Sequence, residues 1–182
     1  MKIWKLDFEV DEYESFIPEK AFTFEEIKSF DGRSHLENWT PLPVKRMEYE
    51  RDLDLGDAPG FSVMPVFSKK TLNCLLPLIS ENVEILPLEF DEGEYFGVNT
   101  TTVLEALDYE KSEYRTYSDG KRIMLIEEYV FIEAKVKDVP IFKIVDERTR
   151  YDFVSESFKE IVEENELKGF KLELVWDSED GK

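Results

Sequence analysis

The sequence is poor in the side chains that most enzymes use for catalysis. Its 182 residues include one histidine, His35, and one cysteine, Cys74. A zinc site of ordinary composition would need both, and their spacing matches no known ligand motif. We expect His35 to lie in a solvated loop and Cys74, among apolar neighbours, to be a small buried residue. A single cysteine also excludes an intramolecular disulfide and favours a reducing compartment.

Motifs for nucleotide chemistry and membrane insertion are missing as well. The chain has no Gly-x-Gly-x-x-Gly fingerprint, no phosphate-binding Gly-x4-Gly-Lys loop and no Gly-x-Ser-x-Gly elbow. No stretch approaches the length of uncharged apolar sequence that a membrane span needs, and the N-terminus lacks the apolar run of a signal peptide. We therefore expect a cytoplasmic protein with no cofactor, no bound metal and no membrane contact.

Positive charge is scarce. The chain has 23 Lys and Arg against 42 Asp and Glu, a net charge of -19. The excess is spread along the sequence, with 10 basic and 19 acidic residues through Asp91 and 13 and 23 after it. Such a surface disfavours direct nucleic-acid binding, because each phosphate contact needs a cation. It favours a positively charged partner, so the sequence predicts a binding protein and not an enzyme.

Apolar residues are nevertheless sufficient for a core. They make up 42% of the chain and include 14 Phe, 8 Tyr and 3 Trp. Period-two alternation, as in Trp4, Leu6, Phe8 and Val10, and short apolar runs predict strands. The expected strands are residues 3–10, 83–90, 95–103, 121–137, 139–145 and 170–176. Capping residues and apolar stripes predict helices. The expected helices are residues 23–30, 68–79 (with a kink or early end at Pro77) and 155–168.

These patterns predict an α+β fold with a mainly antiparallel sheet and two or three helices. Residues 1–64 are expected to form an N-terminal section with a strand, a short helix and a long irregular loop. Residues 65–176 are expected to form the α+β core, and residues 177–182 a polar tail.

Carboxylates offer an alternative, catalytic interpretation. Residues 52–57 resemble a calcium loop, but Asp57 and Val63 stand where Gly and Glu are required, so we do not expect calcium. Glu127 and Glu128 are adjacent on an expected strand and point to opposite faces, so they cannot act as a pair. A carboxylate-based hydrolase that uses a divalent cation, or a structural scaffold without catalysis, remains the alternative to a binding protein.

The last two thirds of the chain contain a set of short motifs. They are Tyr95-Phe96-Gly97-Val98-Asn99, Leu107-Asp108 with Ser112, Ile141-Phe142-Lys143, Val154-Ser155 with Phe158, and Gly169-Phe170 before Trp176. This pattern resembles a bacterial immunity-protein family, number eleven in the polymorphic-toxin series, over about residues 65–176. Lys143 stands where many relatives carry Arg. The resemblance implies a cytoplasmic α+β protein that protects the producing cell by binding a toxin encoded beside it, and it implies no catalytic residues.

Most motif residues also have a structural interpretation. We expect Asp108 to accept hydrogen bonds in a turn, Ser155 to cap a helix and Gly169 to end one. The aromatic motif residues are expected in the core; they are Phe142, Phe158, Phe170 and Trp176.

The binding surface is expected where acidic side chains cluster on loops. Two segments meet this description, residues 52–57 and residues 91–95. The candidate partner-binding residues are Asp52, Asp54, Asp57, Asp91, Glu92, Glu94 and Tyr95. The expected partner is a cognate toxin with a basic surface, for which a nuclease is one candidate.

Overall fold

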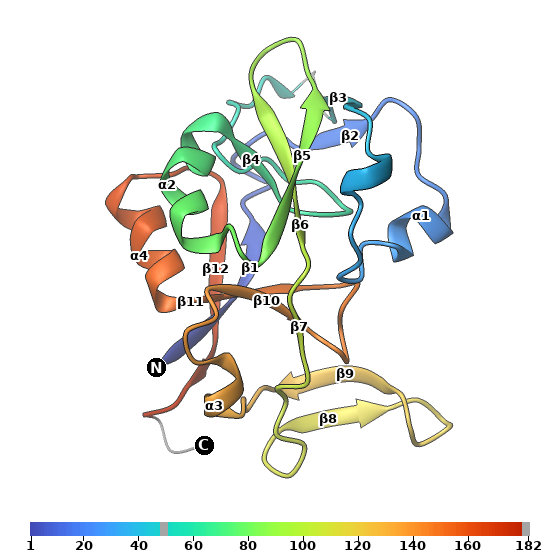
Figure 1. Cartoon of the computed structure of the whole chain (residues 1–182), viewed down its shortest axis with the longest axis vertical. Coiled ribbons are helices and arrows are strands. Elements are labelled where there is room, and N and C mark those ends of the chain that lie inside the picture. Colours follow the sequence, from blue (N-terminus) through green and yellow to red (C-terminus); the bar gives the residue numbers. More distant parts are fainter. Residues whose placement is uncertain (48–50, 180–182) are drawn as a thin grey trace.

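The computed structural model describes residues 1–47 and 51–179. These residues form two five-stranded sheets, a two-stranded hairpin, four α-helices and one 3-10 turn (Figure 1). The strands are β1 (Lys2–Phe8), β2 (Phe16–Pro18), β3 (Leu42–Arg46), β4 (Val66–Ser68), β5 (Val83–Glu89), β6 (Tyr95–Thr100), β7 (Val103–Leu104), β8 (Glu113–Thr116), β9 (Ile123–Glu128), β10 (Ile141–Ile144), β11 (Asp152–Ser155) and β12 (Phe170–Asp177). The helices are α1 (Phe24–Lys28), α2 (Lys69–Ile79), α3 (Glu133–Val136) and α4 (Glu156–Glu164), and the 3-10 turn η1 is Leu36–Asn38.

The two large sheets differ in which parts of the chain they use. The terminal sheet has the order β12-β1-β11-β10-β7, and the middle sheet has the order β2-β3-β5-β6-β4. Parallel pairing occurs between β10 and β7 and between β3 and β5, and the other strand pairs of both sheets and of the β8–β9 hairpin are antiparallel. The expected α+β class is confirmed, and the two parallel pairs mean that neither large sheet is purely antiparallel.

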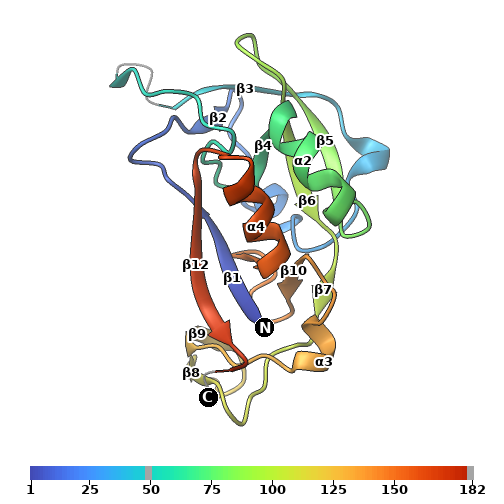
Figure 2. The same ribbon diagram turned by 90° about the vertical axis from the view of Figure 1, so that its left-hand side faces the viewer.

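Strand β1 lies in the interior of the terminal sheet, between β12 and β11. Figure 2 shows β1 and β12 side by side along the molecule. Leu6 packs with Trp4 and Phe8 in the core cluster beneath α2 and α4, so the expected apolar face is confirmed for these three residues. Ile3 is fully buried in a second cluster on the opposite face, because the chain segment after β7 covers that face. Val10 lies beyond the end of β1 and is exposed.

The three expected helices are confirmed, with shifted ends. The Ser68 hydroxyl accepts from the Thr71 amide at 3.2 Å and caps α2. Pro77 lies inside α2, but the helix continues to Ile79. Proline has no amide hydrogen to donate to the Asn73 carbonyl, and the helix tolerates this loss because Asn73 is exposed to solvent. Helix α4 ends at Glu164, earlier than expected.

The strand expected over residues 121–137 is wrong in its second half. Strand β9 ends at Glu128, residues 129–131 are buried in the second core cluster, and α3 follows. The chain must turn back toward β10 here, and a helical turn that buries Val136 achieves this reversal where an extended strand would not. The structure also forms β2 and β3 within residues 1–64, where only one strand was expected.

The expected division at residue 65 stays a prediction, although β1 pairs directly with β11 and β12. Asp177, the first residue of the expected tail, ends β12, and residues 180–182 lie outside the described residues. None of the helices in residues 1–47 and 51–179 has the length and apolar character needed to cross a membrane.

Candidate partner-binding site

The two acidic loops predicted from the sequence lie next to each other in the fold. Arg46, at the end of β3, connects them. Its Nε and Nη2 atoms donate to the two carboxylate oxygens of Glu92 at 3.0 and 2.6 Å, and its Nη1 donates to the Leu53 carbonyl at 3.1 Å. The Tyr95 hydroxyl donates to the Gly56 carbonyl at 3.1 Å and adds a second connection. We call residues 52–57 and 91–95 together the acidic loop pair.

Asp57 is bound within the fold. Its carboxylate accepts from the Ser68 hydroxyl at 3.1 Å, the Lys70 ammonium at 3.2 Å and the Lys168 amide at 3.0 Å. It therefore ties the start of α2 to the turn after α4. That turn needs glycine at position 169, because its φ of +92° lies in the left-handed region that favours glycine and a Cβ here would lie 2.6 Å from the Ala58 carbonyl oxygen.

Tyr95 is a support of the site and not an exposed contact. Its side chain is 8% exposed and packs against the rings of Phe16 and Phe90, at centroid distances of 5.0 and 5.8 Å. Burial raises the pKa of the Tyr95 hydroxyl, and the negative charge of Asp57 raises it further. The hydroxyl therefore stays protonated and keeps its bond to Gly56.

The remaining four candidate residues face solvent. They are Asp52, Asp54, Asp91 and Glu94. Within residues 1–47 and 51–179 their carboxylates form no ion pair, whereas Glu92 is paired with Arg46 and Asp57 with Lys70. The structure thus separates the seven predicted residues into four exposed carboxylates and three side chains that hold the loops in place.

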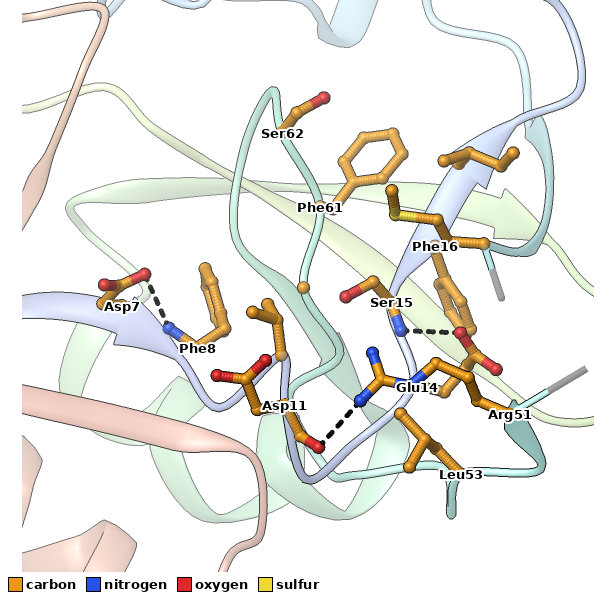
Figure 3. Close-up of a pocket in the computed structure, with 14 residues that line it drawn as sticks. Asp7, Phe8, Asp11, Glu14, Ser15, Phe16, Arg51, Leu53, Phe61 and Ser62 are labelled. Carbon is orange, nitrogen blue, oxygen red and sulfur yellow. Dashed lines mark hydrogen bonds between the residues drawn. The ribbon is translucent and has the colours of Figure 1, made fainter. Parts of the chain in front are cut away.

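A cavity of about 470 Å³ adjoins the acidic loop pair (Figure 3). It lies where the chain leaves β1 and enters β2, and Leu53 of the acidic loop pair forms part of its wall. Gly60 is part of the cavity lining, and a Cβ at this position would lie 2.6 Å from the Ser15 hydroxyl. The Phe16 amide donates to the Gly60 carbonyl at 2.7 Å, so this wall is fixed by the backbone.

The sequence did not indicate Arg46 or the cavity. Arg46 contacts Leu53 and Glu92, which lie 7 and 46 residues further along the chain, so no local pattern marks it. The cavity combines residues of the segments 7–17 and 60–62 with Met47, Arg51 and Leu53, which only the fold brings together.

Most of the motif residues have the structural roles expected of them, but the expectation that Gly169 ends a helix is wrong, because α4 ends at Glu164 with Asn165 as its C-cap and Gly169 lies in the turn before β12. Asp108 accepts from the Glu110 amide at 3.2 Å, and Ser155 caps α4 by accepting from the Phe158 amide at 3.3 Å. The expected aromatic residues are buried. Lys143 is also buried and forms an ion pair with Asp152 at 3.4 Å.

The two residues considered for catalysis lie apart from this site. His35 is half-buried and not solvated as expected, because its ring stacks on Phe30 at a centroid distance of 4.3 Å. Cys74 is half-buried and packs against the core cluster beneath α2 and α4. In the part of the chain that the structure describes, no group of three His, Cys, Asp or Glu side chains is placed to hold a metal ion.

Comparison with known proteins gives one positive result. No curated protein matches the chain. A family model described as Immunity protein family (Imm11) matches residues 88–177, which include the second acidic loop, β6 to β11, α4 and β12. The resemblance expected from the sequence motifs is therefore confirmed, with residues 88–177 as the part of the chain that is similar to the Imm11 immunity protein family.

Proposed function

We propose that this chain is an immunity protein that binds a cognate bacterial toxin and neutralises it in the cytoplasm of the producing cell. The match of residues 88–177 to the Imm11 family carries the proposal. The protein acts by occupying a surface of the toxin and not by catalysis.

The acidic loop pair is the proposed contact surface. Its exposed carboxylates suit a basic toxin, and a net charge of -19 attracts such a partner from a distance. A nuclease is one candidate, because an enzyme that binds nucleic acid needs cations for the phosphates. Arg46, Asp57 and Tyr95 keep the loops in position before the toxin arrives, which lowers the entropy lost on binding.

Coexpression with the product of the neighbouring gene tests this proposal. We expect the two proteins to copurify and the toxin to lose its activity in the complex. Failure of the two products to associate, with both proteins folded, would contradict the proposal.

A matched pair of variants tests the surface. The first neutralises the four exposed loop carboxylates: Asp52→Asn, Asp54→Asn, Asp91→Asn and Glu94→Gln. The control changes the net charge equally at residues around β8 and α3: Glu105→Gln, Glu110→Gln, Glu113→Gln and Glu133→Gln. We expect the first variant to slow association by about tenfold or more and the control to have a much smaller effect. Equal effects would show that only the total charge matters.

A divalent-cation-dependent hydrolase predicts a different result. Calcium, magnesium or manganese would then raise the melting temperature of the protein at saturating concentration. We expect no such shift for an immunity protein.

A further inference from the structure

The cavity beside the acidic loop pair combines negative charge with aromatic walls. Asp7, Asp11 and Glu14 contribute carboxylates, and Arg51 contributes the one cationic side chain among the described residues of its lining. Glu14 is 1% exposed, and one of its oxygens accepts from the Ser15 amide at 3.0 Å. Asp7 and Asp11 are exposed, and one Asp7 oxygen accepts from the Phe8 amide at 2.9 Å. The cavity therefore favours a cation.

The apolar part of the lining restricts which cation fits. Phe8, Phe16 and Phe61 line the cavity, and Val10, 48% exposed, also lines it (Figure 3). A guanidinium is planar, stacks on aromatic rings and is more weakly hydrated than an ammonium. The methylene stem of an arginine covers apolar surface while its head reaches a carboxylate.

The chain's own Arg51 shows that a guanidinium is accommodated here. Its Nη2 atom donates to the Asp11 carbonyl at 3.2 Å. The volume of about 470 Å³ falls within the roughly 300–1,000 Å³ typical of ligand sites, so the cavity is large enough for a long side chain.

We infer that this cavity receives an arginine side chain of the cognate toxin. The inference rests on the proposed function and adds to it the chemistry of one central contact. Leu53 belongs both to the cavity wall and to the acidic loop pair, so one toxin surface can reach the loops and the cavity together. Buried arginines are frequent among the residues that dominate binding energy.

A titration that needs no toxin tests the cavity directly. The probes are the N-acetyl amides of arginine and of citrulline, its neutral isostere, followed by amide chemical shifts in NMR spectra of the whole chain. We expect the arginine probe to shift the amides of Val10, Ser15 and Ser62 and to bind at least about fivefold more tightly than citrulline. Equal binding of the two probes, or no shift at these amides, would overturn the inference.

Variants extend the test to the complex. Val10→Trp places a bulky ring in the cavity lining, and Asp7→Asn with Asp11→Asn removes two charges; both sites are exposed, so folding is expected to persist. We expect each to weaken toxin binding by about tenfold or more, and the Glu133→Gln control to leave it unchanged. If the toxin binds all these variants equally well, the inference fails while the proposed function stands. If no toxin binds the unmodified protein, the proposed function fails, and the probe titration still decides what the cavity accepts.

Discussion

Glu147 is a buried carboxylate held by two neighbours. It is 3% exposed, its Oε2 accepts from the Tyr129 hydroxyl at 2.6 Å, and its Oε1 lies 3.7 Å from Arg150. Burial raises the pKa of Glu147, and the Tyr129 hydrogen bond and the Arg150 charge offset only part of this effect. Burial likewise raises the pKa of Tyr129, so its hydroxyl remains a donor.

This pKa shift makes stability depend on pH. When the folded-state pKa lies above the unfolded value of about 4.3, the unfolded chain releases the proton first as the pH rises. Ionisation of Glu147 therefore lowers the free energy of unfolding as the pH rises from the unfolded pKa through the folded one, and the loss is complete above it. We expect the stability of the Glu147→Gln variant, relative to that of the unmodified protein, to be highest at neutral pH.

Urea denaturation at pH 4 and pH 7 measures this difference. The exposed Glu133→Gln is the control, and we expect its effect to be the same at both values. If the effect of Glu147→Gln on stability is also the same at pH 4 and pH 7, the pKa of Glu147 is not raised in the folded protein.

The sequence located the acidic loops but not the function of each residue within them. The contacts of Asp57 with Lys70 and Lys168 span 13 and 111 residues, so nothing near Asp57 in the sequence distinguishes it from the exposed Asp54. Tyr95 is an aromatic residue at the start of a strand, and such residues are common in protein cores, so its burial follows an ordinary pattern.

At the level of elements, β3 supplies the connection between the two acidic loops through Arg46. We expect Arg46→Met to cost about 1–2 kcal/mol of stability, because three hydrogen bonds are lost and Glu92 is left unpaired at a partly exposed site. Urea denaturation measures the cost, and hydrogen exchange of the amides in residues 52–57 and 91–95 should become faster.

Arg33→Met is the matched control for Arg46→Met. Arg33 is an exposed arginine whose guanidinium pairs with Asp31 at 2.9 Å, close to it in the sequence. We expect a change within about 0.5 kcal/mol. If both variants cost the same, Arg46 does not connect the loops in solution.

Elements with local signals were predictable, and elements formed by distant pairing were not. Ser68 and Ser155 mark their helices, and the alternation after Gly169 marks β12. Strand β3 contains Pro43 and pairs in parallel with β5, where Leu42 faces Leu88, so its own sequence resembles a loop. Helix α3 is four residues long and follows a segment rich in residues that favour strands. Its helical turn therefore depends on tertiary packing.

For the whole molecule, a net charge of -19 makes charge steering the expected mode of encounter with the basic toxin that we propose as partner. We expect the association rate with the toxin to fall by tenfold or more between about 0.02 and 0.5 M salt, because screening shortens the range of the attraction. The dissociation rate should change much less. Stopped-flow mixing measures both rates, and an association rate independent of salt would contradict charge steering.

The position of β1 determines when the terminal sheet can form during synthesis. β1 is translated well before its two neighbours in the sheet, which are residues 152–155 and 170–177. Both edges of β1 therefore stay unpaired until almost all of the chain described here has been translated, since pairings this distant in sequence form late. A nascent chain that stops before β12 would lack one partner of β1 and leave that edge open to aggregation, so formation of the complete terminal sheet depends on translation running through residue 177.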